Sequence, residues 1–256
     1  MRALSEILTE SATIAVDDGT TMSAYAARPD GDGPHPAIVV AAELFGVTAH
    51  ARDICERLAR EGHLAIAPDL YHRTAPHTEL PHDPAGRERG FDLLHRMTRP
   101  EVVADVRAAV GYVRAGGAPR VGMFGVSVGG HVAYLAATEL DLDAVAVAYG
   151  GWLPGTGIPI GRPEPTLAGT PRITARVLAL YGEDDHAIPE ADRTAVAAAL
   201  ADAGIRHEFV TYPGVAHGFL CDRRDTYDKA AAEDAWRRVL GLFTAELIPA
   251  ATASGG

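Results

Sequence analysis

The chain has 256 residues, 47% of them hydrophobic and 22% charged, which suits one large α/β domain or two small ones with a substantial core. The formal net charge of −11 disfavours nucleic acid or an anionic membrane surface as a partner. The sequence has no apolar run of about 18 residues, no signal-peptide core and only two cysteines, so we expect a cytoplasmic protein without a membrane segment or a disulfide framework.

The first part of the chain predicts a β-hairpin, and alternating strands and helices follow it. Hydrophobic and polar residues alternate at 13–16 and 22–26 on either side of the turn sequence Asp17-Asp18-Gly19. The continuous apolar run Ala37–Ala42 is typical of a parallel strand that is buried on both faces. Periodicity then predicts helices at 49–61, 101–115, 189–203 and 227–247, strands at 63–67, 144–149, 176–181 and 207–212, and a further strand and helix around residue 127.

Three segments lack this periodicity. Tyr71–Gly90 is polar and rich in proline and histidine, and Gly150–Thr170 is rich in glycine and proline, so we expect both to be irregular. No linker divides the chain, which predicts a single domain over residues 1–248 and a flexible tail at 249–256. The alternation of strand and helix predicts a doubly wound, mostly parallel sheet with an N-terminal antiparallel hairpin. In such sheets ligands bind beyond the carboxyl ends of the strands.

Residues Val121 to Gly130 predict the position of a nucleophile. They read V-G-M-F-G-V-S-V-G-G, an apolar strand that passes through G-x-S-x-G into a helix. In a nucleophile elbow the turn is too tight for side chains beside the serine, so Gly125 and Gly129 flank Ser127 and hold its hydroxyl at the sheet edge. An ordinary Gly/Ser turn is the alternative, and the strand and helix on either side of the motif favour the elbow.

A serine hydroxyl attacks only when a base takes its proton, and that base needs an acid to orient it. His217 is the candidate base, because it follows the last predicted strand in the glycine-flanked loop P-G-V-A-H-G-F. The acid is expected after the preceding strand, where Glu183, Asp184 and Asp185 all qualify by position. Serine, acid and histidine then follow one another in the chain order of α/β-hydrolases.

Glu43 interrupts an otherwise apolar stretch, A-I-V-V-A-A-E-L-F-G. A buried carboxylate is costly unless it is paired or neutral, so one interpretation is that the strand has ended and Glu43 faces water. The other interpretation places Glu43 near Ser127 at the carboxyl end of the strand. The backbone N–H groups of Leu44 and Val128 could then form an oxyanion hole, which stabilises the charge that develops on a carbonyl oxygen.

Several motifs in order resemble the dienelactone hydrolase (carboxymethylenebutenolidase-like) family. They are E-L-F-G, A-P-D-L-Y-H-R, G-V-S-V-G-G, Y-G-E-D-D-H-A-I-P, A-H-G-F and Y-D-K-A-A-A-E-D-A-W, and together they span about residues 13–247. The resemblance implies a single α/β-hydrolase domain without a large lid, which acts on lactones or small esters and uses neither metal nor cofactor. It selects Asp185, the aspartate before H-A-I-P, as the acid, and it makes Glu43 an auxiliary acid near the nucleophile.

The chain departs from the family pattern at its nucleophile. The best-known members carry cysteine in the elbow, where this chain has Ser127. A thiol can react as a thiolate with the nearby glutamate taking part, whereas serine relies on His217 as a general base. The resemblance therefore leaves the role of Glu43 open.

The residues that would bind a substrate carboxylate also differ. The lactone enzymes follow their histidine with a serine and then an arginine, and Gly218 and Cys221 take those places here. A second carboxylate-binding arginine is expected in the 71–90 segment. The candidates for the two positions are Arg223, Arg224, Arg87 and Arg89.

Aromatic residues near the predicted strand ends are candidates for the substrate pocket. Tyr149 and Trp152 follow a strand end and Phe219 lies in the histidine loop, so each could line the acyl pocket, with core packing as the alternative. The two cysteines, Cys55 and Cys221, are interpreted as buried small apolar residues.

Three histidines in the 71–90 segment are candidates for a metal site. His72, His77 and His82 are five residues apart beside Asp83, and this spacing suits no helix face. We therefore expect no metal and no cofactor.

Taken as an enzyme, the chain is expected to hydrolyse small carboxylic esters or lactones through an acyl-enzyme formed by Ser127, His217 and Asp185. We expect a small-molecule substrate, no nucleic-acid or membrane partner, and a monomer or homodimer. The alternatives are a general esterase, lipase or peptidase on the same fold, and a non-catalytic protein that binds a ligand on this scaffold. Intact serine, histidine and aspartate argue against the non-catalytic alternative.

Overall fold

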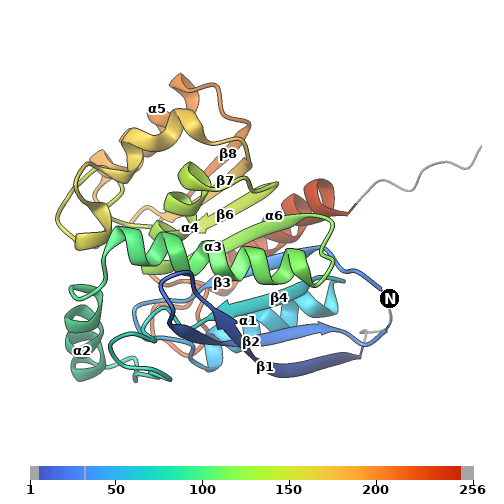
Figure 1. Ribbon diagram of the computed structural model, residues 1–256. Helices are drawn as coiled ribbons and strands as arrows, with labels where there is room; N and C mark the ends of the chain where they lie inside the picture. The colour runs from blue at the N-terminus through green and yellow to red at the C-terminus, as the bar shows by residue number, and fades with distance from the viewer. Residues whose placement is uncertain (1–5, 32, 249–256) are drawn as a thin grey trace, which may run out of the picture.

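A computed structural model describes residues 6–31 and 33–248. Within these residues eight strands form one sheet in the order β1-β2-β4-β3-β5-β6-β7-β8 (Figure 1). The strands are β1 Ile7–Ala15, β2 Thr21–Pro29, β3 Ala37–Ala41, β4 Leu64–Pro68, β5 Val121–Val126, β6 Ala144–Ala148, β7 Arg176–Gly182 and β8 His207–Tyr212. The doubly wound, mostly parallel sheet is therefore confirmed, and the expected tail at 249–256 lies outside the described residues.

The N-terminal hairpin is antiparallel, as expected, but longer than the alternation predicted. β1 pairs with β2 from Ile7 opposite Pro29 to Ala15 opposite Thr21. β2 then joins β4, also antiparallel, and the strands from β4 to β8 run parallel to one another. Only the C-terminal part of β1 buries alternate residues. Its N-terminal half has no buried positions that would produce a hydrophobic alternation in the sequence.

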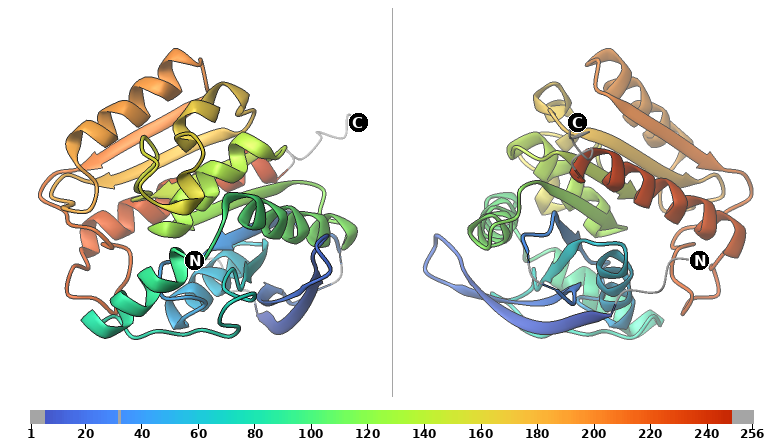
Figure 2. Two further views of the ribbon diagram at one scale, coloured as in Figure 1. Left: turned by 60° about the vertical axis from the view of Figure 1, so that its left-hand side comes forward. Right: turned by 90° about the vertical axis from the view of Figure 1, so that its right-hand side faces the viewer.

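Helices cover both faces of the parallel strands, which explains why β3, β5 and β6 are buried along their whole length. α1 Ala49–Arg60 and α6 Lys229–Leu247 pack on one face, whereas α3 Arg99–Ala115, α4 Val128–Glu139 and α5 Glu190–Asp202 lie on the other (Figure 2). Successive residues of β3 alternate between the two cores: Val39 faces the second group of helices, and Ile38 and Val40 face the first. Within the described part of the chain, no helix is long and apolar enough to cross a membrane.

The expectation that Tyr71–Gly90 is irregular is wrong in its second half. α2 spans Pro84–Leu94 and begins inside that segment. Asp83 caps the helix, since its carboxylate accepts a hydrogen bond from the Gly86 amide at 2.7 Å, and Pro84 occupies the first turn, where no amide hydrogen is needed. The Gly150–Thr170 segment, also expected to be irregular, contains two short 3₁₀ helices, η1 Pro159–Gly161 and η2 Thr166–Arg172.

A buried histidine joins the helix after the serine to this 150–170 segment. His131 of α4 is fully buried, and its Nδ1 donates to the Gly151 carbonyl oxygen at 2.8 Å. Its Nε2 accepts from the Thr166 hydroxyl at 2.8 Å, and that hydroxyl in turn accepts from Arg99 at 3.0 Å. Burial lowers the pKa of His131 to about 4, so the ring is neutral in the folded protein at neutral pH.

The neutral state of His131 predicts acid sensitivity. The unfolded chain binds a proton at this histidine near pH 6.5 and the folded chain only near pH 4, so stability is lost as the pH falls through that window. The loss should be on the order of 3 kcal/mol at the acid end. We expect urea unfolding of His131→Gln to show a smaller loss of stability between pH 6.5 and 4 than the wild type. The exposed His95→Gln should keep the wild-type slope, and equal slopes for all three proteins would contradict the assignment.

Candidate active site

Ser127 lies at the sharp turn between β5 and α4, as the elbow motif predicted. Its backbone has φ 56° and ψ −119°, a left-handed conformation that is strained for a residue with a side chain. A Cβ on Gly125 would overlap the Gly129 carbonyl oxygen, and a Cβ on Gly129 would overlap the carbonyl oxygen of Ala41 at the end of β3. The two glycines therefore permit a close approach of β3, β5 and α4 that no other residue allows.

The structure brings Ser127, His217 and Asp185 together. Ser127 Oγ lies 2.9 Å from His217 Nε2, and His217 Nδ1 lies 2.7 Å from Asp185 Oδ2. Because the aspartate oxygen accepts, Nδ1 carries the proton and Nε2 is free to accept the serine hydroxyl hydrogen. The three side chains thus stand in the nucleophile–base–acid order that the sequence predicted.

The loops that follow β7 and β8 are hydrogen-bonded to each other, and this contact brings the Asp185 carboxylate to the His217 ring. The Asp184 amide donates to the Val215 carbonyl oxygen at 3.0 Å, and Gly182 has no room for a side chain against the same residue. Asp185 is the buried acid, with its side chain fully covered and its second oxygen accepting from the Ala187 amide at 2.9 Å. The side chain of Glu183 instead reaches the Gly214 amide at 3.3 Å, in an exposed contact.

The two backbone amides expected to form an oxyanion hole lie at the same cavity as the serine. Leu44 follows β3, Val128 is the first residue of α4, and both line the cavity with Ser127 and His217. Among residues 6–31 and 33–248, neither amide donates to a backbone carbonyl oxygen in the hydrogen bonds of turns, loops and helix ends. An N–H at the start of a helix has no partner within that helix, so the Val128 amide is free to bind an oxyanion.

The cavity has a volume of about 300 Å³ and combines an apolar wall with cations. Trp152 and Phe91 meet edge to face, with ring centroids 6.2 Å apart, and the Arg87 guanidinium lies 5.6 Å from the Phe91 ring. Arg224 enters from the histidine loop, 5.9 Å from the Phe45 ring. Trp152, Arg87 and Arg224 therefore line the same cavity as Ser127, and their contact with a substrate stays a prediction.

Glu43 does not face water. Its side chain is 3% exposed, and Oε1 lies 3.4 Å from Nη1 of Arg224. Burial alone would raise the pKa of Glu43, but the neighbouring His82, His50 and Arg224 outweigh it and hold that pKa below its ordinary value. The carboxylate is therefore charged, and it sits behind the cavity wall with Arg224 between it and the open space.

Other expected substrate-binding residues lie elsewhere. Arg89 pairs with Asp92 on the exposed surface of α2, and Arg223 pairs with Asp53 at 2.7 Å. Phe219 is fully buried against Tyr149, with ring centroids 5.2 Å apart, so it is a core residue, as the alternative interpretation had it. Tyr149, expected together with Trp152 either to line the pocket or to pack in the core, is fully buried, and its ring lies 5.0 Å from that of His217.

The histidines of the 71–90 segment diverge. His72 contacts Asp105 at 3.1 Å, His77 contacts Ser23 at 3.3 Å, and His82 lies 3.6 Å from Glu43. They do not form a common site, in agreement with their spacing. Both cysteines are buried and unpaired, as interpreted from the sequence.

Ser127 lies in a strained turn at the end of β5, a central parallel strand, and it is within reach of His217 and Asp185 from the loops after β8 and β7. This arrangement defines the chain as an α/β-hydrolase. Comparison with known proteins narrows this class.

Residues 22–247 match the Dienelactone hydrolase family. A Synechocystis protein named “Putative carboxymethylenebutenolidase” is 37% identical over 88% of this chain and 92% of its own length. A protein of the same name from Escherichia coli K12 is 35% identical over 88% of this chain and 83% of its own length. The crystal structure of a “Putative Dienelactone Hydrolase” from Klebsiella pneumoniae superposes with a TM-score of 0.85, at 33% identity, over 93% of this chain and 99% of that one. The chain belongs to the dienelactone hydrolase family.

The close packing at the elbow predicts that Gly129 tolerates no side chain. We expect Gly129→Ala to lower the free energy of unfolding by about 1–3 kcal/mol, because the added methyl group meets the backbone of β3. Gly111→Ala is the matched control, since Gly111 lies in α3 with open space around its Cα and the change should stabilise by about 0.5–1 kcal/mol. Urea denaturation measures both, and a Gly129→Ala protein as stable as the wild type would refute the packing constraint.

Proposed function

We propose that this family member hydrolyses small carboxylic esters or lactones through an acyl-enzyme on Ser127. The observation that carries the proposal is the pair of contacts at His217, 2.9 Å to the serine hydroxyl and 2.7 Å to the Asp185 carboxylate. A base at hydrogen-bond distance from the nucleophile, with an acid that fixes its tautomer, is what serine acyl transfer requires.

In the first half of the reaction His217 Nε2 takes the proton of Ser127 as the serine oxygen attacks the substrate carbonyl carbon. The carbonyl oxygen gains negative charge, which the amides of Leu44 and Val128 stabilise by hydrogen bonds formed in the transition state. Asp185 stabilises the imidazolium and keeps its orientation. When the carbon–oxygen bond to the leaving group breaks, Nε2 returns the proton to the leaving alkoxide, and the acyl group stays on Ser127.

In the second half water takes the place of the alcohol. His217 removes a proton from the water as it attacks the acyl carbon, and Nε2 then protonates Ser127 Oγ as the free acid leaves. In a lactone the leaving alcohol stays attached to the acyl group through the carbon chain, so water releases a single hydroxy acid from Ser127.

The substrate class follows from the charges around the cavity. Arg87 lies at the cavity with no ion pair to an acidic residue of the described chain, whereas Arg224 is held by Glu43. A carboxylate on the substrate would pair with Arg87 and with the outward side of Arg224, and the aromatic rings of Phe91 and Trp152 would pack on its hydrocarbon part. The proposal is therefore a compact ester or lactone that carries a carboxylate.

The nucleophile is tested by replacing Ser127 with alanine. We expect Ser127→Ala to lower kcat for p-nitrophenyl acetate by about 10⁴-fold or more and to abolish labelling by a fluorophosphonate probe. Ser11→Ala, at an exposed serine of β1, should keep both. Circular dichroism establishes that both variants fold. Labelling of folded Ser127→Ala at the wild-type rate would rule out this serine.

The charge of the substrate is tested by two arginines on the same helix. Arg87→Gln should raise KM for a carboxylate-bearing lactone by about 10-fold to 100-fold, the worth of one charged hydrogen bond, and leave KM for p-nitrophenyl acetate nearly unchanged. Arg89→Gln should change neither value, because Arg89 does not line the cavity. Equal KM values for wild type and Arg87→Gln on the anionic lactone would contradict the proposed selectivity.

A further inference from the structure

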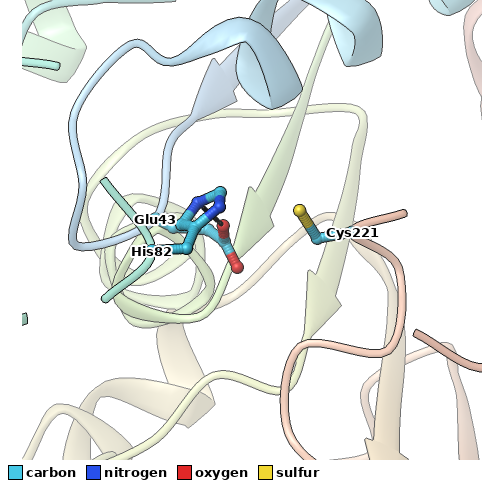
Figure 3. Close-up of side chains that lie close together, drawn as sticks. All are labelled: Glu43, His82 and Cys221. Carbon is cyan, nitrogen blue, oxygen red and sulfur yellow. Dashed lines mark ion pairs between the residues drawn. The ribbon is translucent and has the colours of Figure 1, made fainter. Parts of the chain in front are cut away.

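Three side chains with metal-binding atoms meet behind the wall of the cavity. They are Glu43, at the end of β3, His82, in the segment before α2, and Cys221, in the loop that carries His217. One ligand atom of each lies within 4.8 Å of the other two. Figure 3 shows Glu43 and His82 side by side, with Cys221 facing them from a separate part of the chain. None of the three is required by the proposed acyl transfer as a proton donor or acceptor.

The polar atoms of this cluster are buried without hydrogen bonds. Glu43 Oε2 and His82 Nε2 have no hydrogen-bond partner among the described residues, although both are inaccessible to solvent. They lie 3.6 Å apart, too far for a hydrogen bond to each other. Arg224 contacts the other carboxylate oxygen, Oε1, and so leaves Oε2 unsatisfied. Orphaned buried groups of this kind cost about 1–3 kcal/mol each and call for an explanation.

A bound ion would account for this separation. In a tetrahedral zinc site the ligand atoms lie about 2.0–2.3 Å from the metal, which places them about 3.5 Å from one another. The distance between Oε2 and Nε2 already matches such an edge. The Cys221 sulfur lies within 4.8 Å of a ligand atom of each of the other two residues, so it would have to approach by up to about 1.3 Å to complete the set.

We propose that Glu43, His82 and Cys221 form a binding site for a thiophilic divalent cation, with Zn²⁺ as the ion of best fit. One carboxylate oxygen, one imidazole nitrogen and one thiolate sulfur are the three ligand types of protein zinc sites, and Mg²⁺ or Ca²⁺ would reject the sulfur. Three protein ligands leave the fourth position to water.

Protons and charges balance when the ion binds. The thiol of Cys221 loses its proton to solvent as the sulfur–metal bond forms, while Glu43 binds as a carboxylate and His82 binds through the lone pair of Nε2. The thiolate and the carboxylate together neutralise the two charges of the ion. The site is also reachable, because the His82 side chain is 15% exposed and offers a path from solvent.

By coordination, the ion would link three segments that surround the candidate active site. Glu43 immediately precedes the oxyanion residue Leu44, Cys221 lies four residues after His217, and His82 stacks edge to face on Phe45, with ring centroids 4.5 Å apart. A metal at this point would join the two loops and the 71–90 segment more strongly than the long Glu43–His82 contact does. Binding should therefore stabilise the folded protein.

Cobalt provides the direct test, because Co²⁺ bound to a thiolate has a charge-transfer band in the near ultraviolet. We expect metal-free full-length protein to bind one equivalent of Co²⁺ with that band and to lose it when Zn²⁺ is added. Cys221→Ala should remove the band, and His82→Ala should weaken Co²⁺ and Zn²⁺ binding by at least about 100-fold. Cys55→Ala and His95→Ala, at the other cysteine and at an exposed histidine, should behave as the wild type.

Thermal unfolding gives a second readout that does not depend on activity or on the serine mechanism. Zn²⁺ should raise the Tm of the wild type and of Ser127→Ala alike, and should leave the Tm of folded Cys221→Ala unchanged. No thiolate band with Co²⁺, or a band and a Tm shift that persist in Cys221→Ala, would overturn the proposal. Loss of esterase activity in Ser127→Ala with the band intact would separate the two sites.

Discussion

The close approach of β3, β5 and α4 at the elbow is the constraint on which the rest of the site depends. The carbonyl oxygen of Ala41 occupies the space where a side chain on Gly129 would stand. This contact places the end of β3 against the start of α4, so the amides of Leu44 and Val128 come to the same cavity although they are more than 80 residues apart in sequence. It also fixes Ser127 in its strained conformation, because the packed elements on each side leave the turn no room to relax.

The wall of the cavity depends on a second interaction, between Glu43 and Arg224. A carboxylate that is 3% exposed would be very costly without a cation beside it, and Arg224 is the arginine that meets it. The same guanidinium lines the cavity, so its position toward a ligand is set from behind by Glu43. Removing the glutamate would therefore free the arginine to move, and removing the arginine would leave an unpaired buried charge.

Much of the fold was predictable from the sequence, because buried parallel strands and helices have strong apolar patterns and short connections. The segment before Leu94 was not, since its helix has a weak apolar face and starts within a run of prolines and histidines. Asp83 followed by Pro84 was the available signal for that helix start. Recognising α2 would also have separated Arg87 from Arg89, because residues two apart on a helix point about 200° away from each other.

The meeting of the three proposed catalytic residues was predictable for a different reason from the positions of the residues around them. Ser127, Asp185 and His217 each follow a parallel strand, and parallel strands deliver their carboxyl ends to one edge. Glu43 lies near Arg224, His82 and Cys221, which come from loops with no regular spacing, so only the folded chain reveals this proximity. The burial of Phe219 could not be predicted for the same reason, since a shift of one position in a loop moves a side chain from the core to the cavity.

The burial of α4 affects whether the protein refolds after it unfolds on heating. Every residue of Val128–Thr138 is buried, so this helix has no face that water can solvate. Once the surrounding layers open, the segment exposes a mostly apolar surface, in which His131 is one of the few polar side chains, and such a surface associates with other unfolded chains. Heat inactivation should thus be irreversible, and the lifetime of the folded protein will be governed by its rate of opening.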